Sequence, residues 1–476
     1  MIRQIDNIFG TDGIRDVGGH GWLAPEGLER LAVAIVKFAE RRGVPVPRIL
    51  IARDPRASGP GIEAILTAAL ESCDLFGASP TVRHAGILPT PAVSVLVEAG
   101  VADLGIVISA SHNPPEFNGV KLFGPDGRKL TVEEERRITA DALAQVPTRS
   151  RRSAGGAEPT IADSTLECDS LRDRYLELLL APFGTDPFLE GMSIVLDCAR
   201  GATSVCAVEA FRRAGATVHA IHAEPDGDRI NLGCGSTHPE AISGAVLARA
   251  ADLGIAFDGD GDRAILVDAT GQVVDGDEML TLWALDLASR GALPKNRIAV
   301  TVMSNAGMET YLSEQGISLI RTQVGDREVH QAMIREGLAL GGEQSGHLIE
   351  GSAATGDGIR SGLALARIVK QSGRTLEELR QPIPRYPQTL IGIEIAEKIP
   401  FDSLPALGEV LAEAERALAG HGRVLLRYSG TEPLARILVE GSQAAENAEW
   451  AERIGQVLRE QPALHACSVS DRDAVI

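Results

Sequence analysis

The pentapeptide ADLGI occurs twice in this chain, at 102–106 and 251–255, and both copies lead into an apolar stretch. Each copy lies in a segment with the order apolar strand, helical stretch, apolar strand, at roughly 49–123 and 192–267, and a third segment at 297–348 has the same order. Strands that alternate with helices of this length are typical of doubly wound α/β units. The shared pentapeptide indicates an internal repeat, although chance similarity between two helix–strand junctions would also produce it.

The domain organisation follows from the length and from two changes in the pattern. With 476 residues, the chain is too long for a single hydrophobic core. The stretch 147–165 is polar and contains Gly, Pro and Ser, which predicts a surface loop or a domain linker, and from about 385 the pattern becomes that of a smaller α+β domain. We therefore expect three repeated doubly wound α/β domains and a smaller C-terminal α+β domain, with bounds at 1–165, 166–266, 267–384 and 385–476.

Charge and cysteine content argue against several classes of function. The 46 Lys and Arg stand against 65 Asp and Glu, a net charge of −19, which argues against nucleic acid and anionic membrane as partners. A small anion can still bind at local arginines, because salt screens charges over about 8 Å. No apolar run is long enough for a membrane helix, and the N-terminus lacks the apolar part of a signal peptide. The scattered cysteines lack the spacing of zinc ligands, so we expect reduced thiols and a cytoplasmic protein.

A polar cluster follows the last strand of each of the three segments. These clusters are SASHNP at 109–114, DGDGDR at 258–263 and GGEQSGH at 341–347. In open α/β sheets, ligands bind beyond the carboxyl ends of the strands. Three repeats that point three such clusters to one place would form an active site.

The second cluster places Asp258, Asp260 and Asp262 in alternation with glycines. Glycine lets the backbone fold tightly so that the carboxylates converge, and three such carboxylates repel one another without a cation. A hard divalent cation, most of all Mg²⁺, is therefore expected. The cluster is no EF-hand, since Arg263 stands where that loop needs glycine. A solvated acidic turn is the alternative, and Arg263 can hold a phosphoryl oxygen or simply balance charge.

The stretch LRYSGTEPLARILVEG, at 426–441, suits a phosphate group. Arginines offer planar forks, hydroxyls offer further donors, and a glycine permits a nest of backbone amides. The residues concerned are Arg427, Ser429, Gly430, Thr431 and Arg436. A plain turn between two strands is the alternative.

Two other motifs are weaker signals. In GGEQSGH, Glu343 and Ser345 can bind neighbouring sugar hydroxyls on a glycine-rich loop, although a β-turn explains the motif equally well. In FGTDGIRD, Arg15 is a candidate phosphate ligand, although a surface arginine is the commoner case.

Ser111 is the candidate nucleophile of the first cluster. A serine is a poor nucleophile unless a base takes its proton or the serine is already charged with a group, and the hydrolase elbow G-x-S-x-G is absent here. A phosphorylated Ser111 that faces Mg²⁺ accounts for a metal site, a phosphate site and a sugar site in one protein. Lys121 and His112 can then move protons on and off the sugar hydroxyls, although a purely structural hydrogen bond explains His112 as well.

With TDGIR, SASHNP, DGDGDR, GEQSGH and RYSGTEP in this order over nearly its whole length, the chain resembles the α-D-phosphohexomutases. The resemblance implies four domains around a central cleft, and a phosphoserine that gives its phosphoryl group to one end of a sugar phosphate. The resulting hexose bisphosphate, an intermediate and activator, reorients and returns its other phosphate. The resemblance implies Ser111 as the phosphoserine and one Mg²⁺ per chain, held by Asp258, Asp260, Asp262 and a phosphoserine oxygen.

The same resemblance implies roles for the remaining motif residues. Lys121, Arg15 and Arg263 would surround the transferring phosphoryl group. The substrate would contact Asp326, Arg327, Glu343 and Ser345, and its non-reacting phosphate would contact Arg427, Ser429, Gly430, Thr431 and Arg436. The expected partner is a small-molecule sugar phosphate, and the expected assembly is a monomer or a homodimer.

Four features are similar to the bacterial branch of this family that interconverts glucosamine phosphates for cell-wall precursors. They are CGSTHPE at 234–240, TVMSN at 301–305, TQVGDREV at 322–329 and Gln344. The phosphomannomutase/phosphoglucomutase branch, with the same mechanism, is the alternative.

Two positions depart from the family pattern, and two rival functions compete with it. Asp16 stands where glycine is common, and Tyr428 stands where lysine is frequent.

A haloacid-dehalogenase-type phosphatase would use Asp258 as its nucleophile, but its motif needs Thr or Val where Asp262 stands. A non-catalytic sugar-phosphate-binding protein would have lost a motif residue, and no motif residue is lost here.

Overall fold

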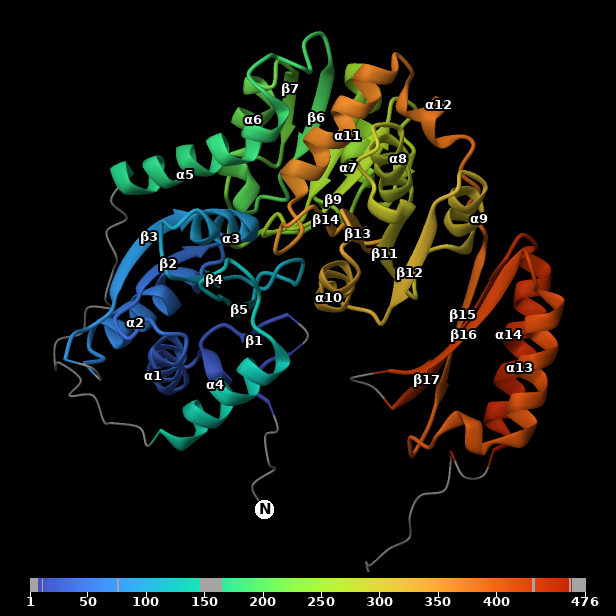
Figure 1. The fold of residues 1–476 in the computed structure, drawn as a ribbon, viewed down its shortest axis with the longest axis horizontal. Helices are drawn as coiled ribbons and strands as arrows, with labels where there is room; N and C mark the ends of the chain where they lie inside the picture. Colours follow the sequence, from blue (N-terminus) through green and yellow to red (C-terminus); the bar gives the residue numbers. More distant parts are fainter. Residues whose placement is uncertain are drawn as a thin grey trace, which may run out of the picture. The chain divides into compact units, whose positions relative to one another are not determined.

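The computed structural model describes residues 7–10, 12–74, 77–145, 165–429, 433–461 and 464. The chain divides into two compact units, residues 1–301 with 322–380 and residues 302–321 with 381–476. Strands and helices alternate along most of the chain (Figure 1). Most of the predicted linker, up to residue 164, lies outside the described residues.

The first sheet has five strands in the order β1-β5-β4-β2-β3. Strands β2, β3 and β4 are parallel, and β5 runs antiparallel to β4 and to β1. Because side chains alternate along a strand, one face packs on α1, α2 and α4 in a shared core, and the other face packs on α3. The bounds are β1 Ile14–Val17, α1 Pro25–Arg41, β2 Arg48–Arg53, α2 Gly59–Glu71, β3 Thr81–Ile87, α3 Thr90–Glu98, β4 Leu104–Ile108, β5 Phe117–Phe123 and α4 Val132–Ala144.

The second sheet repeats this arrangement in the order β10-β9-β8-β6-β7. Strands β6, β7 and β8 are parallel, and β9 runs antiparallel to β8 and to the short β10. The doubly wound repeats predicted from the sequence are thereby confirmed. The bounds are α5 Thr165–Leu180, β6 Ser193–Asp197, α6 Ala207–Arg213, β7 Thr217–Ile221, α7 Glu240–Arg249, β8 Leu253–Phe257, β9 Ala264–Asp268 and β10 Val273–Val274.

The aspartates of the two ADLGI copies make the same backbone contact in the two sheets. Asp103 Oδ2 accepts a hydrogen bond from the Arg48 amide at 2.8 Å. Asp252 Oδ2 accepts one from the Ser193 amide at 2.7 Å. Each aspartate therefore ties the entry of the central strand to the first residue of its parallel neighbour.

The glycines of the two copies let a helix approach the central strand closely. A Cβ on Gly105 would lie 2.5 Å from a methyl carbon of Val93 on α3. A Cβ on Gly254 would lie 2.7 Å from a methyl carbon of Val246 on α7. The repeated sequence thus serves a repeated packing requirement, which favours an internal repeat over chance similarity.

The third repeat supplies a further set of strands and helices to the first unit. Strand β11 pairs in parallel with β13, and β13 pairs antiparallel with β14. The bounds are α8 Gly276–Ser289, β11 Arg297–Thr301, α10 Asp326–Glu336, β13 Leu340–Gly342, β14 Leu348–Glu350, α11 Gly358–Ser372 and α12 Leu376–Arg380.

The second unit contains the predicted smaller α+β domain. Its antiparallel sheet has the order β15-β17-β16, and α13 and α14 cover one face of it (Figure 1). The bounds are α9 Ala306–Glu314, β12 Ser318–Thr322, β15 Gln388–Glu394, α13 Pro405–Ala417, β16 Gly422–Tyr428, β17 Leu434–Gly441 and α14 Ala444–Arg459. Among the described residues of the whole chain, no helix is long and apolar enough to cross a membrane.

Candidate active site

Ser111 lies in the loop between β4 and β5 with its backbone in the left-handed region, at φ 53°. Residues with a Cβ seldom adopt this conformation. The side chain is fully buried, and its Oγ donates to Asp258 Oδ2 at 2.7 Å. His112 Nδ1 lies 3.4 Å from the same Oγ. The fold therefore brings the predicted nucleophile to a predicted metal ligand of the second repeat.

A fully buried arginine, Arg56, holds the Ser111 loop through its backbone carbonyls. Its guanidinium donates to the carbonyl oxygens of Ser111, Asn113, Pro114 and Phe117. The equally buried Asp54 pairs with its Nε at 2.9 Å and neutralises the charge. An arginine that is buried, paired and used by four carbonyls acts as a rigid clamp on the loop.

Further bonds fix both backbone groups of Ser111. Asn231 Nδ2, from the second repeat, donates to the Ser111 carbonyl at 2.9 Å. The Ser111 amide donates to Ser109 Oγ at 2.9 Å, and Ser109 Oγ donates to Asp54 Oδ2 at 2.5 Å. These bonds offset a left-handed backbone that costs on the order of 1–3 kcal/mol. Asp54 and Arg56 were not among the residues predicted from the sequence, although the polar run that contains them directly follows an apolar strand, as the other clusters do.

The three aspartates of the second cluster are almost completely buried. One oxygen from each lies within 4.8 Å of the others, and Asp260 Oδ1 and Asp262 Oδ1 have no hydrogen-bond partner in the described part of the chain. Burial, and then the charges of Asp262 and Asp260, raise the pKa of Asp258 well above its ordinary value. Buried carboxylate oxygens without partners, at this mutual spacing, fit a hard divalent cation such as Mg²⁺.

Lys121 lies beside this carboxylate cluster. Its Nζ is 2.7 Å from Asp260 Oδ2 and 3.4 Å from Asp262 Oδ2. Asp12, a residue that our sequence analysis did not single out, lies 2.8 Å from the same Nζ and 2.7 Å from Lys129 Nζ. Burial lowers the pKa of Lys121, but Asp12 and Asp260 outweigh it and raise this pKa well above its ordinary value, so the ammonium stays charged.

The third repeat contributes Asp326 and His347 to the same network. Asp326, at the start of α10, pairs with Lys129, and its Oδ2 lies 3.7 Å from His347 Nε2. The Gly356 amide donates to Nε2 at 2.9 Å, which places the ring proton on Nδ1, beside Asp262 Oδ2 at 3.7 Å. His347 was not among the residues predicted from the sequence, although it ends the GGEQSGH motif.

The other predicted substrate contacts of the third repeat are Glu343, Ser345 and Arg327, and they range from an exposed side chain to a largely buried ion pair. Glu343 Oε1 accepts from the Gly325 amide at 3.2 Å, and Ser345 is exposed. The Arg327 guanidinium makes two contacts with the buried carboxylate of Glu135 on α4, one of them at 3.0 Å. Arg327 thus joins the first and third repeats through an ion pair.

Two arginines and a neutral imidazole surround Ser111. Arg15 donates to two groups of the Ser111 loop at 3.3 Å each and pairs with Asp12 at 2.7 Å. Arg263 Nε is buried without a hydrogen-bond partner among the described residues. Burial, and then the charges of Arg263 and Arg15, lower the pKa of His112 to about 4, so this ring is neutral near pH 7.

Comparison with known proteins agrees with this arrangement. The curated phosphoglucosamine mutase of Desulfovibrio desulfuricans is 41% identical to this chain over 461 residues, which cover 96% of this chain and 99% of that protein. The phosphoglucosamine mutase of Thermobifida fusca is 42% identical over 462 residues, with the same coverage. Models of phosphoglucomutase/phosphomannomutase domains match as α/β/α domains I, II and III at 6–147, 173–271 and 275–386 and as the C-terminal domain at 390–457.

The chain belongs to the phosphoglucomutase/phosphomannomutase family. The predicted resemblance and fold class are therefore confirmed. Solved structures share the fold at lower identity. A family protein from Burkholderia thailandensis has a TM-score of 0.72 at 23% identity and covers 95% of this chain and 97% of its own. The N-acetylphosphoglucosamine mutase of Aspergillus fumigatus has a TM-score of 0.62 at 18% identity and covers 95% of each chain.

In this family member, three of the predicted phosphate residues, Arg427, Ser429 and Arg436, lie on or just beyond the strands of the C-terminal sheet. Arg427 on β16 and Arg436 on β17 are register partners in the antiparallel ladder. Burial, and then the charge of Arg436, lower the pKa of Arg427. Like charges directly opposite each other destabilise a ladder, and a bound anion relieves this. Ser429 is buried just beyond β16, while Gly430 and Thr431 lie outside the described residues.

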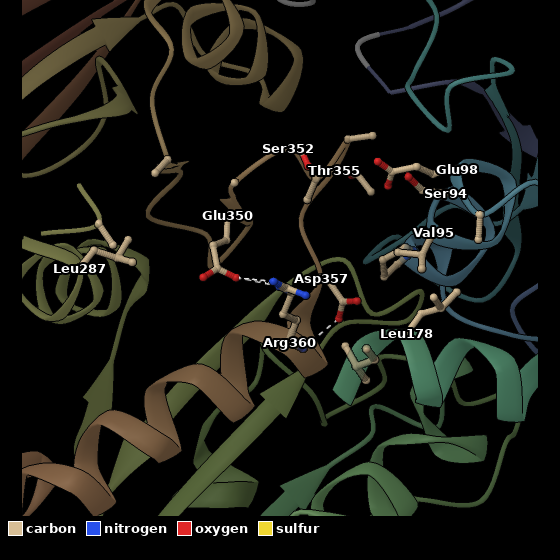
Figure 2. A pocket seen from close by; sticks show the side chains of 18 residues that line it. Ser94, Val95, Glu98, Leu178, Leu287, Glu350, Ser352, Thr355, Asp357 and Arg360 are labelled. Carbon is tan, nitrogen blue, oxygen red and sulfur yellow. Dashed lines mark hydrogen bonds and ion pairs between the residues drawn. The ribbon is translucent and has the colours of Figure 1, made fainter. Parts of the chain in front are cut away.

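A pocket of about 560 Å³ lies between α3 and the loop that follows β14 (Figure 2). Glu98, Glu350 and Asp357 bring carboxylates to it, and Arg360 pairs with Glu350 at 2.7 Å. None of the predicted site residues is among the described residues that line it. Its surplus of carboxylates suits a sugar phosphate poorly, so the cluster around Ser111 is the candidate active site of this family member.

Proposed function

We propose that this chain is a phosphoglucosamine mutase, an isomerase that interconverts glucosamine 6-phosphate and glucosamine 1-phosphate through a phosphoserine at Ser111. The observation that carries the proposal is the buried Ser111 Oγ, 2.7 Å from Asp258 in a trio of carboxylates with unpartnered oxygens. The choice of an amino sugar is supported by the full-length relatives, which are phosphoglucosamine mutases.

In this proposal, Asp258, Asp260 and Asp262 hold one Mg²⁺ together with an oxygen of phosphorylated Ser111. When bound, the ion neutralises negative charge on the phosphoryl group during transfer. The unpartnered oxygens of Asp260 and Asp262 are the structural support for this ligand set.

The protein's own contribution to the transfer is positioning and charge. The bond between phosphorus and Ser111 Oγ breaks, a bond to a sugar hydroxyl oxygen forms, and the proton of that hydroxyl ends on Oγ. The Arg56 clamp and Asn231 fix the direction of Oγ through the Ser111 carbonyl. Lys121 stays charged beside the reacting group, and His112, 3.4 Å from Oγ, is placed to carry the proton.

The sugar must be held in two orientations, because each of its ends receives a phosphoryl group in turn. Glu343 and Ser345 bind hydroxyls in either orientation, with Asp326 and Arg327 beside them. The non-reacting phosphate is gripped by Arg427, Ser429, Gly430, Thr431 and Arg436, a role supported by the like-charged pair that β16 and β17 place in register. The hexose bisphosphate intermediate also restores an enzyme that has lost its phosphoryl group.

The proposal includes a cellular setting. The enzyme acts in the cytoplasm as a monomer or a homodimer, and its product supplies UDP-N-acetylglucosamine and cell-wall precursors. The composition, with scattered cysteines and an acidic net charge of −19, supports this setting.

Phosphorus NMR of the purified chain tests the proposal. Glucosamine 6-phosphate, glucose 6-phosphate and mannose 6-phosphate are supplied separately, with Mg²⁺ and a trace of hexose bisphosphate. We expect rapid 1-phosphate formation from glucosamine 6-phosphate and far slower reaction of the other two sugars. Faster turnover of glucose or mannose phosphate would retain the phosphoserine mechanism and reject the amino-sugar assignment.

A further inference from the structure

Three side chains of metal-ligand type meet at the end of β6, outside the candidate active site. Asp197 ends β6, His222 directly follows β7, and Cys234 lies in the loop before α7. One carboxylate oxygen, one ring nitrogen and the sulfur lie within 4.8 Å of one another. Asp197 and Cys234 are fully buried, and the His222 side chain is 22% exposed.

The buried charge of Asp197 lacks the kind of partner found in the first repeat. There, the buried Asp54 pairs with the buried guanidinium of Arg56 at 2.9 Å. Among the described residues, the cationic group within ion-pair distance of Asp197 is the ring of His222, with Nδ1 3.1 Å from Oδ2. The Ala199 amide donates to Asp197 Oδ1 at 2.9 Å and the Gly235 amide donates to Oδ2 at 3.0 Å, but both donors are neutral. Because a buried carboxylate remains costly without a compensating charge, this position favours either an imidazolium or a bound cation.

The geometry of the His222 ring favours a cation. Nδ1 is buried and makes no hydrogen bond to any described residue, although Asp197 Oδ2 is only 3.1 Å away. A nitrogen and an oxygen 3.1 Å apart without a bond between them lie close to the spacing of two ligands of one ion, since metal–ligand bonds of about 2.0–2.2 Å that meet near the tetrahedral angle put the two ligand atoms roughly 3.3–3.6 Å apart. The backbone of His222 is also left-handed, at φ 48°.

We propose that Asp197, His222 and Cys234 bind a divalent transition-metal ion of the zinc class, with water in the remaining position. Carboxylate, imidazole and thiolate together suit Zn²⁺ and Co²⁺, whereas the oxygen ligands of the Asp258 cluster suit Mg²⁺. On binding, the S–H bond of Cys234 breaks, the sulfur keeps the electron pair and binds the metal with it, and the proton goes to solvent. This metal site does not depend on the proposed mutase activity.

Metal binding is the step that converts the Cys234 thiol into a thiolate. Burial, and then the charge of Asp197, raise the pKa of Cys234 to about 11, so the sulfur is protonated at neutral pH without a metal. Arg200 Nη1 lies 3.5 Å from the sulfur, where its charge stabilises a thiolate but opposes a metal ion. Removal of the Arg200 guanidinium should therefore strengthen metal binding.

The site would brace the loop that supports Ser111. The Asn231 amide donates to the Ala199 carbonyl at 3.0 Å, and Asn231 Nδ2 donates to the Ser111 carbonyl at 2.9 Å. An ion held by Asp197 and Cys234 would link the end of β6 to the loop on which Asn231 lies. The proposed metal is therefore structural, with its effect transmitted to Ser111 through one amide side chain.

The test is a Co²⁺ titration of the full chain in saturating Mg²⁺, followed through the near-ultraviolet thiolate-to-cobalt absorption band. Co²⁺ at the Asp258 cluster meets oxygen ligands, so the band reports on Co²⁺ bound to a thiolate, and the cysteine variants show which thiolate it is. We expect one Co²⁺ per chain in this band and loss of the band in Cys234→Ser. Binding in His222→Gly should weaken by more than the roughly 10–100-fold that loss of an outer-shell partner already costs. His222→Gly suits the left-handed backbone and should fold without strain.

Cys206→Ser is the matched control, because Cys206 is equally buried and lies outside the cluster. This control should keep the band, and Arg200→Ala should bind Co²⁺ more tightly. At one Zn²⁺ concentration, the rise in Tm should be larger for the parent chain than for His222→Gly. A parent chain without a thiolate band, or a band that survives Cys234→Ser, overturns the proposal. Unchanged Co²⁺ affinity in His222→Gly overturns the three-ligand assignment.

Discussion

The first and second α/β repeats share the order of four strands, β5-β4-β2-β3 and β9-β8-β6-β7, but carry different chemistry at the ends of their strands. In both, ADLGI enters the central strand, its aspartate caps the neighbouring strand, and its glycine admits a helix. Beyond that strand, the first repeat presents Ser111 on a clamped loop, and the second presents three buried carboxylates. The comparison teaches that residues which set backbone packing stay alike, while the loops at the carboxyl ends are free to differ.

The two repeats also differ in how they treat a buried aspartate near the end of the first strand. Asp54 is neutralised by Arg56, and the pair holds the Ser111 loop. Asp197 meets His222 and lies near Cys234 instead. One repeat therefore neutralises its aspartate with an arginine, and the other places a histidine and a cysteine beside it.

The largest expected effect is on mutase turnover, and it should appear when the serine of the first repeat is changed but not when a serine of the second repeat is changed. Ser111→Ala should lower mutase turnover on the order of 10⁴-fold or more while the fold is kept, because the group that carries the phosphoryl is lost. Ser204→Ala, which removes a buried hydroxyl without a partner among the described residues from the second repeat, is the control and should leave turnover unchanged. Coupled assay and circular dichroism measure both; substantial activity in Ser111→Ala would reject the phosphoserine.

The next effect concerns the clamp of the first repeat. Arg56→Met leaves Asp54 buried without its partner and should lower the free energy of unfolding by about 3–5 kcal/mol. Arg200→Met, at a partly exposed arginine in the second repeat, should lower it by less than about 1 kcal/mol. Urea denaturation measures both. Addition of Asp54→Asn should recover part of the loss in Arg56→Met, and a full loss that persists would contradict the charge-pair explanation.

A smaller effect on the free energy of unfolding tests whether Gly105 and Gly254 both serve to let a helix approach the central strand. Gly105→Ala and Gly254→Ala should each destabilise by about 1–3 kcal/mol, because each new methyl meets a valine of the packed helix. Val93→Ala should relieve the first of these and leave the second unchanged. Gly244→Ala, in open space on α7, should be neutral or stabilising in the same thermal unfolding assay. Equal costs at all three glycines would mean that helix approach is not the reason for ADLGI.

The smallest effect compares the two ADLGI aspartates as a function of pH. The hydrogen bond from the Arg48 side chain, together with the one from its amide, lowers the pKa of Asp103 below its ordinary value. A depressed folded-state pKa stabilises above the unfolded pKa of about 3.9, and this contribution is lost as the pH falls through the folded value. The difference in Tm between the parent and Asp103→Asn should therefore be present at pH 6 and shrink below about pH 4.

Asp252→Asn is the companion variant, because it removes a charged acceptor from the Ser193 amide at the equivalent place in the second sheet. Each substitution should cost at most about 1 kcal/mol near neutral pH. A pH-independent difference for Asp103→Asn would show that the Arg48 contact contributes nothing through charge.

Sequence reasoning predicted the repeated α/β units and the three polar clusters, because strand periodicity and strand-end polarity are local signals. It missed Arg56, Asn231 and His347, whose partners lie 55, 120 and 9 residues away. The roles assigned to the site residues stay predictions, those of Ser111 and the three aspartates as well as those of Glu343, Ser345 and the C-terminal phosphate residues. The position of Arg327 on Glu135 could not be foreseen, since no local pattern links α4 to α10.

What this sequence determined by itself is the order of strands and helices, the repeat, the family and the residue types at each strand end. These depend on hydrophobic alternation and on short motifs, which act over a few residues. Only the tertiary structure decided which charges neutralise one another, Asp54 with Arg56 and Lys121 with Asp12, and that Asp197 lies beside a histidine and a cysteine that lack zinc-ligand spacing along the chain. The physical reason is that burial makes unpaired charge costly, and the partners that satisfy it are brought together by packing of segments far apart in sequence.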